Sequence, residues 1–195
     1  MPILSFLLYV FVTKFTPGPN NIMAMLSANK YGFNKTMKFC LGVGTGFFVI
    51  MLLCSYFNLL LTNTIPKIEF YMTIFGSIYM LYLAVKIMFS KGNNKESDQN
   101  NNNGFFTGMI LQFINPKVIL YGITAISTFV IPFNNSNLSL ILYSLFLAFV
   151  GFVGTVCWSS FGSLFQKFLT KYKSQFNVVM ALLLLYSAVS IFLEK

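Results

Sequence analysis

The residues best suited to chemistry in this chain are two lysines that fall inside long apolar runs. Lys14 precedes the proline-containing stretch Thr16–Asn21 (TPGPNN), and Lys117 is the last residue of the second one, Asn115–Lys117 (NPK). An ammonium near the centre of a bilayer costs roughly 2.5–3.5 kcal/mol on insertion scales, so it normally faces a cavity or a partner. The pattern predicts a buried polar site that meets a carboxylate or carries a proton.

The TPGPNN stretch interrupts an apolar run that is long enough to cross a bilayer. Pro17 and Pro19 each remove a backbone donor, and Gly18 adds no stiffness. If the helix breaks here, its second half begins near Pro19 and exposes amides whose partial positive charge attracts an anion. Asn20 and Asn21 add side-chain donors and acceptors. We expect the break to hold a small carboxylate; a kink that only shapes packing is the alternative.

The expected binding residues come from both proline stretches and their neighbours. Lys117 would meet a ligand carboxylate or carry a proton, with snorkelling to the interface as the alternative. Lys14 would serve similarly or reach the outer interface. Thr45 lies between two glycines, where helix packing is the commoner role. The full substrate-binding set is Pro17, Gly18, Pro19, Asn20, Asn21, Thr45, Gln112, Asn115 and Lys117.

The composition is that of an integral membrane protein. The chain of 195 residues is 56% hydrophobic and 9% charged, whereas soluble domains carry about 25% charged residues. The net charge of +9 is the balance of 13 basic and four acidic residues, and the basic residues are all lysines that fall mainly between apolar runs. This placement indicates orientation in a membrane and argues against a nucleic-acid partner.

No set of residues predicts an enzyme, a metal site or a cofactor. The chain has no His and no HExxH, G-x-S-x-G or Walker motif. Its four acidic residues fall in predicted loops or at span ends, so any proton coupling would use Lys117, Lys14, the substrate or water. Cys40, Cys54 and Cys157 lack metal-type spacing and are expected to be small buried hydrophobes.

The apolar runs predict an all-α membrane protein with six transmembrane helices and a retained first span. The expected spans are about Ile3–Leu26, Phe39–Leu61, Phe70–Phe89, Phe105–Ile131, Leu138–Leu164 and Phe176–Leu193. The segments after the first, third and fifth spans are rich in lysine. Since lysine-rich loops stay in the cytoplasm, both termini should face outward.

A polar, Asn-rich stretch, Lys91–Gly104, divides the chain into two halves of three spans. We expect a flexible cytoplasmic linker between residues 1–90 and 105–195. Because three is odd, the second half enters the membrane from the opposite side. Two inverted three-helix repeats, with Pro-interrupted helices one and four, form the pattern of a secondary transporter.

These residues resemble the LysE/RhtB family of amino-acid exporters. The likeness rests on TPGPNN, Tyr31–Phe33, Gly42–Gly46 and Leu111–Lys117 (LQFINPK), and it covers nearly the whole chain. It implies efflux of small neutral amino acids, such as cysteine or O-acetylserine, across the bacterial cytoplasmic (inner) membrane, with protons as the coupling ion. Lys14 departs from the resemblance, in which a small apolar residue precedes TPGPNN.

Other functions stay open at this point. Homoserine, threonine or another neutral amino acid is an alternative cargo within the exporter class. A passive channel or a structural membrane subunit is the alternative from another class. A homo-oligomer is compatible with the sequence.

Overall fold

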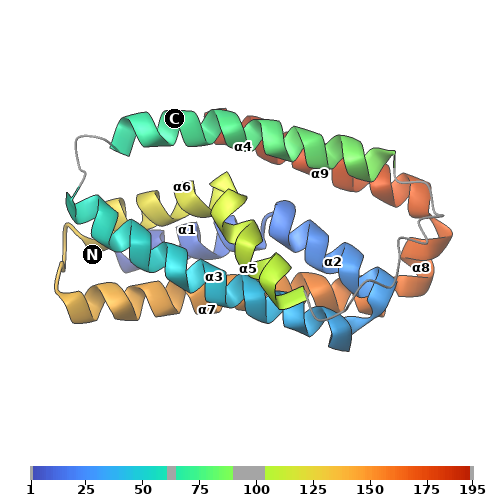
Figure 1. The fold of residues 1–195 in the computed structure, drawn as a ribbon, viewed down its shortest axis with the longest axis horizontal. Helices are drawn as coiled ribbons and strands as arrows, with labels where there is room; N and C mark the ends of the chain where they lie inside the picture. Colours follow the sequence, from blue (N-terminus) through green and yellow to red (C-terminus); the bar gives the residue numbers. More distant parts are fainter. Residues whose placement is uncertain (1, 61–64, 90–103, 194–195) are drawn as a thin grey trace.

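The computed structural model describes residues 2–60, 65–89 and 104–193, and every regular element in these ranges is helical. The expected all-α fold is therefore confirmed. Most helices run along the longest dimension of the molecule (Figure 1). In chain order the elements are α1 (Ile3–Phe15), α2 (Pro19–Tyr31), α3 (Phe33–Leu60), α4 (Ile65–Met88), α5 (Gly104–Ile114), α6 (Pro116–Thr124), the π-helix η2 (Ala125–Val130), α7 (Asn137–Leu164), α8 (Gln166–Lys171) and α9 (Lys173–Leu193).

Both predicted helix breaks are present. The chain is extended at Thr16 and Gly18, between α1 and α2. Asn115 separates α5 from α6, and the helices bend by 61° there. Pro19 and Pro116 each begin the second helix of a pair, where the missing N–H would have no helical acceptor in any case.

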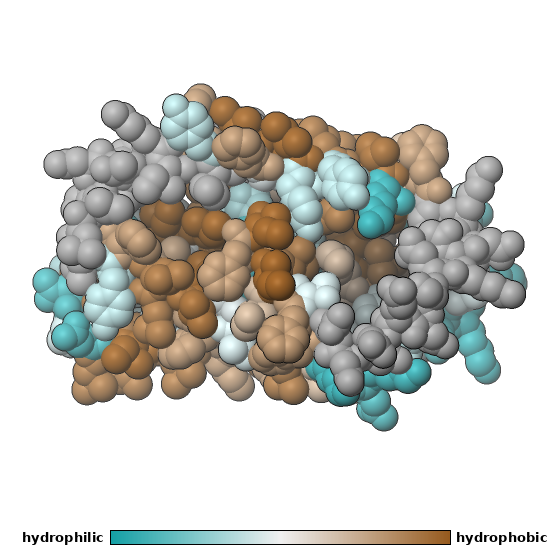
Figure 2. Space-filling model, in the orientation of Figure 1, coloured by the Kyte–Doolittle hydropathy of each residue, from teal (hydrophilic) through white to brown (hydrophobic). Residues whose placement is uncertain are grey.

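The helices suit a membrane in length and composition. Helix α3, from Phe33 to Asn58, and helix α7 are each long and apolar enough to cross, and the bent α5–α6–η2 unit makes a third span if counted as one. Apolar side chains cover most of the visible face, and hydrophilic ones gather toward its ends (Figure 2). Two shorter apolar helices, α1 and Thr73–Met88, add to the apolar body.

Some boundaries differ from those expected. Helix α4 begins at Ile65, so Glu69 is part of the helix and not of the preceding loop. Of the expected linker, Gly104 already belongs to α5, and residues 91–103 lie outside the described part of the chain. Cys40 and Cys54 are buried as expected, whereas Cys157 is exposed on α7. The expectation that Cys157 is buried is wrong, because apolar helices in lipid bury only part of their circumference.

The two halves of the chain pack crosswise. Helix α3 lies against both α5 and α6, the two parts of the second broken helix. Helix α7 lies against α1 and α2, the two parts of the first. Helices α4 and α9 pack together along one side of the molecule (Figure 1). The two breaks are thus held at the centre by helices from the opposite half.

Glycines allow the backbones of α3 and α5 to touch. A Cβ on Gly108 would collide with the Phe39 carbonyl, and a Cβ on Gly46 would lie 2.6 Å from the Met109 carbonyl. The predicted packing role of the Gly42–Gly46 stretch is therefore confirmed at Gly46. Such contacts let helices associate in lipid, where no hydrophobic effect drives them together.

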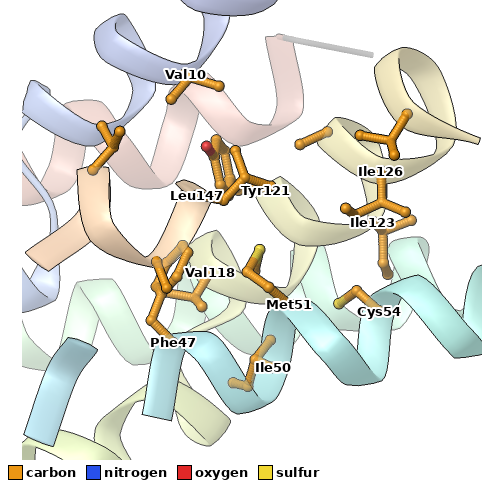
Figure 3. Close-up of a cluster of buried hydrophobic side chains, with 14 of the residues drawn as sticks. Val10, Phe47, Ile50, Met51, Cys54, Val118, Tyr121, Ile123, Ile126 and Leu147 are labelled. Atoms are coloured by element: carbon orange, nitrogen blue, oxygen red, sulfur yellow. The ribbon is translucent and has the colours of Figure 1, made fainter. Parts of the chain in front are cut away.

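A buried apolar cluster fills the space between α1, α3, α6, η2 and α7 (Figure 3). Tyr121, Phe47, Met51 and Leu147 are among its fully or almost fully buried side chains. A second cluster joins α2, α4 and α9. The polar break lies between these apolar clusters.

Gly108→Ala tests the close approach of α3 and α5. We expect destabilisation of about 1–3 kcal/mol, since the added methyl must push two backbones apart. Gly104→Ala is the matched control on the same helix, because its Cβ would meet its nearest atom at 3.7 Å. Thermal unfolding in detergent compares the two variants. An unchanged midpoint for Gly108→Ala would contradict the packing described here.

Candidate functional site

The carbonyl groups that the first break frees from helical bonding are bonded by side chains. Asn21 Nδ2 donates to the carbonyl oxygens of Lys14 (2.8 Å) and Thr16 (3.0 Å). Trp158 Nε1, from α7, donates to the Phe15 carbonyl at 3.2 Å. In hydrocarbon an unsatisfied carbonyl costs several kcal/mol, so these bonds are what allow a break at this depth.

The Pro17 carbonyl receives two donors from the second half of the chain. Ser187 Oγ of α9 donates at 2.7 Å, and Lys117 Nζ of α6 donates at 3.2 Å. Lys117 Nζ also donates to Thr16 Oγ1 at 2.9 Å. The lysine therefore ties α6 to the extended segment between α1 and α2.

Three amide side chains join the two breaks. Asn20 Nδ2 donates to Gln112 Oε1 at 2.6 Å, and Asn115 Nδ2 donates to Asn20 Oδ1 at 3.1 Å. Gln112 also donates to Asn20 Oδ1 at 3.3 Å. Asn115 caps α6 by accepting from the Lys117 amide at 3.2 Å. Because Gln112 and Asn115 are buried, this cluster fixes the relative position of the breaks.

A cavity of about 40 Å³ lies where these groups meet. It has room for roughly three waters, since one water needs about 10–15 Å³. That is less than an amino acid occupies. The polar groups of the site bond to one another, and we call this arrangement the closed state. The cavity is lined by Thr13, Lys14, Thr16, Gly18, Pro19, Asn20, Asn21, Val43, Phe47, Asn115, Lys117, Val118, Gly151 and Thr155.

The cavity carries positive charge and helix N-terminal amides. Lys14 and Lys117 both line it, and none of the lining residues is acidic. Asn20 and Asn21 are in the first turn of α2, where backbone N–H groups have no acceptor within the helix. The arrangement favours an anion such as a carboxylate.

Most of the expected binding residues meet in one place. Pro17 and Gln112 do not line the cavity themselves but bond to side chains that do. Thr45 is the exception, because it is exposed on α3 and donates to its own helix at Leu41. Thr45 is therefore removed from the candidate set. The hydroxyl of a helical threonine can donate to the carbonyl one turn earlier in its own helix, as Thr45 does. The position of Thr45 between two glycines therefore did not indicate ligand binding.

Sequence reasoning did not find every residue that contacts the break or lines its cavity. Ser187, Thr155 and Phe47 lie on three separate helices, and no motif links them to TPGPNN. Ser187 is a small polar residue in an apolar run, which is a weak signal. Trp158 likewise lies in no motif that links it to TPGPNN, although its indole supports the break from α7.

No group of three or more potential metal ligands (His, Cys, Asp or Glu) occurs in the part of the chain that the structure describes. The polar groups around the cavity can donate hydrogen bonds to a small anion, and in this structure they join the helices on either side of the cavity. Fold and site together define a membrane protein with two interrupted helices that meet at a small polar cavity, which is the pattern of a translocator.

Comparison with known proteins identifies the family. The family model described as "LysE type translocator" matches residues 11–195. A "Cysteine/O-acetylserine efflux protein" of Salmonella choleraesuis (strain SC-B67) is 42% identical over 188 residues, 96% of each chain. A protein of the same description from Escherichia coli O157:H7 is 39% identical over the same length and coverage. No solved structure matches. The chain belongs to the LysE family and is a membrane translocator, not an enzyme.

Asn21→Ala tests the dependence of the break on side-chain donors. The variant leaves the Lys14 and Thr16 carbonyls without their donor, and each unsatisfied buried group costs about 1–3 kcal/mol. We expect a clearly lower thermal midpoint in detergent. Asn34→Ala, on an exposed position of α3, is the control. Equal midpoints for the two variants would contradict this role for Asn21.

Proposed function

We propose that this translocator exports small neutral amino acids, with cysteine and O-acetylserine foremost, across the bacterial cytoplasmic membrane. The observation that carries the proposal is the meeting of both helix breaks at one cavity, where Lys117 bonds to the first break. The names of the two relatives support the cargo. These substrates are zwitterions with small side chains, so they need one carboxylate site and one amine site.

The geometry suggests an exchange of partners on binding. Lys117 Nζ bonds to two neutral acceptors in the closed state, Thr16 Oγ1 and the Pro17 carbonyl. A ligand carboxylate is the stronger acceptor for an ammonium, so its arrival would draw Lys117 away from the break. The substrate ammonium would then take the acceptors that Lys117 leaves. Each ammonium keeps a partner throughout, and the tether between α6 and the break is released.

The proposal includes six spans arranged as two inverted repeats. The two breaks are alike, with a proline at the first position of α2 and of α6. Helix α3, which follows the first broken helix, packs against the second, and helix α7, which follows the second, packs against the first. Such an arrangement allows one half to rock against the other about the binding site. Protons are the proposed coupling ion, carried by Lys117, by Lys14 or by the substrate itself.

A passive channel or a structural subunit is disfavoured by membership of a translocator family. Export of homoserine, threonine or another neutral amino acid is the competing assignment within the family. The cavity does not separate these cargoes by size, because it is closed. A substrate panel decides between them.

Uptake into inside-out vesicles with labelled amino acids tests the function. We expect cysteine and O-acetylserine to accumulate against a gradient, and accumulation to stop when the pH gradient is collapsed. Simple equilibration would indicate a channel. No movement of any amino acid would refute the proposal.

Lys117→Met and Asn20→Ala test the site in the same vesicles. Asn20→Ala removes the hydrogen bonds between the amide side chains, and Lys117→Met removes charge-assisted bonds, which are worth about 1.5–3 kcal/mol. Uptake should therefore fall about 10- to 100-fold in each variant. Lys35→Met is the control for charge removal, because Lys35 is exposed on α3, and Thr45→Ala is the polar control. Wild-type uptake by Lys117→Met would place the site elsewhere.

Topology is tested with a reporter fused within residues 91–103. The positive-inside rule places this segment in the cytoplasm, with both termini outside. A cytoplasm-dependent reporter should therefore be active there and inactive at the C-terminus. The opposite pattern would reverse the proposed orientation.

A further inference from the structure

Lys14 has surroundings unlike those of Lys117. Its ammonium nitrogen lies over two aromatic rings, 3.4 Å from the Tyr121 centroid and 3.7 Å from the Phe47 centroid. Both rings are buried to 98% (Figure 3). Ring faces carry negative potential and attract an ammonium. The two rings therefore hold the charge without forming a hydrogen bond to it.

The rings of Phe47 and Tyr121 under Lys14, which we call the aromatic shelf, are held in place by their neighbours. Tyr121 is also stacked with Tyr9, with ring centroids 5.5 Å apart and planes 6° from parallel. The backbone of Lys14 is fixed as well, because its carbonyl accepts from Asn21 and Gly154 of α7 packs against it. Side chain and backbone thus hold the ammonium at one place on the cavity wall.

The ammonium group of Lys14 has N–H donors that are available to a ligand. Among residues 2–60, 65–89 and 104–193 no side chain or backbone group accepts a hydrogen bond from it, and no carboxylate pairs with it. Aromatic faces do not saturate its three N–H donors, which are directional. Since Lys14 lines the same cavity as Lys117, the cavity contains two ammonium groups and no anion of the described chain.

Two ammonium groups in one cavity favour a ligand that has more than one acceptor. A substrate carboxylate neutralises one of them, at Lys117 and the first turn of α2. The ammonium of Lys14 would then keep the two aromatic rings as its only partners, and its N–H donors would still lack an acceptor from the described part of the chain. A ligand whose side chain ends in an acceptor or an anion supplies one.

We propose that Lys14, on the shelf of Phe47 and Tyr121, is the subsite for the substrate side chain and selects small amino acids that carry a hydrogen-bond acceptor or an anion beyond Cβ. This inference rests on the proposed function and specifies its substrate class. The ester carbonyl of O-acetylserine and the sulfur of cysteine fit the subsite. An aliphatic side chain of the same size does not, and a cationic side chain is repelled.

The test compares cysteine and O-acetylserine with 2-aminobutyrate, which replaces the thiol of cysteine by a methyl group. Ligand-induced thermal shifts of the purified full chain give apparent affinities, and vesicle uptake gives transport. Wild type should favour O-acetylserine and cysteine over 2-aminobutyrate. In Lys14→Met, which keeps the length of the side chain, that preference should fall about tenfold, or about 1.4 kcal/mol, while 2-aminobutyrate is bound as well as before or better.

Two further variants separate this role from its alternatives. Lys14→Arg keeps the charge and stacks on aromatic rings, so it should restore part of the preference. Lys117→Met should weaken all three ligands together, because it removes the carboxylate contact.

Three outcomes would overturn the inference. The first is an unchanged preference in a folded Lys14→Met protein, and the second is an equal loss of all three ligands in that variant. The first would leave the proposed function intact, and the second would make Lys14 a general part of binding or coupling. The third is a wild-type protein that binds and moves none of the amino acids, which would remove the proposed function as well.

Discussion

The constraint on which this structure depends is that backbone carbonyls in hydrocarbon must be bonded. The TPGPNN stretch breaks a helix and frees the carbonyls of residues 14–17. Side chains from α2, α6, α7 and α9 meet that need. Because the donors come from both halves of the chain, satisfying the break also assembles the bundle.

The same constraint creates the site. Once the carbonyls have donors, the groups at the break that attract an anion are the first amides of α2 and the ammonium groups of Lys14 and Lys117. Lys117 has a double role, since it stabilises the closed state and is suited to meet a carboxylate. A ligand that competes for such a tether can change the packing of the helices it joins.

The two lysines illustrate how surroundings divide one residue type into different roles. Lys117 reaches oxygen acceptors across the junction of the two halves. Lys14 rests on rings that attract its charge but accept no conventional hydrogen bond. The difference arises from what α3 and α6 place opposite each side chain, Phe47 and Tyr121 in one case and the break itself in the other.

The sequence by itself determined the helical membrane class, both break positions and most of the polar residues near them, because proline, glycine and long apolar runs act locally. Only the tertiary structure decided which polar groups share the cavity. It excluded Thr45, added Ser187 and Trp158 as donors, and placed Lys14 on an aromatic shelf. These outcomes depend on the rotation and crossing of helices far apart in the chain, which apolar patterns of lipid-facing helices specify only weakly.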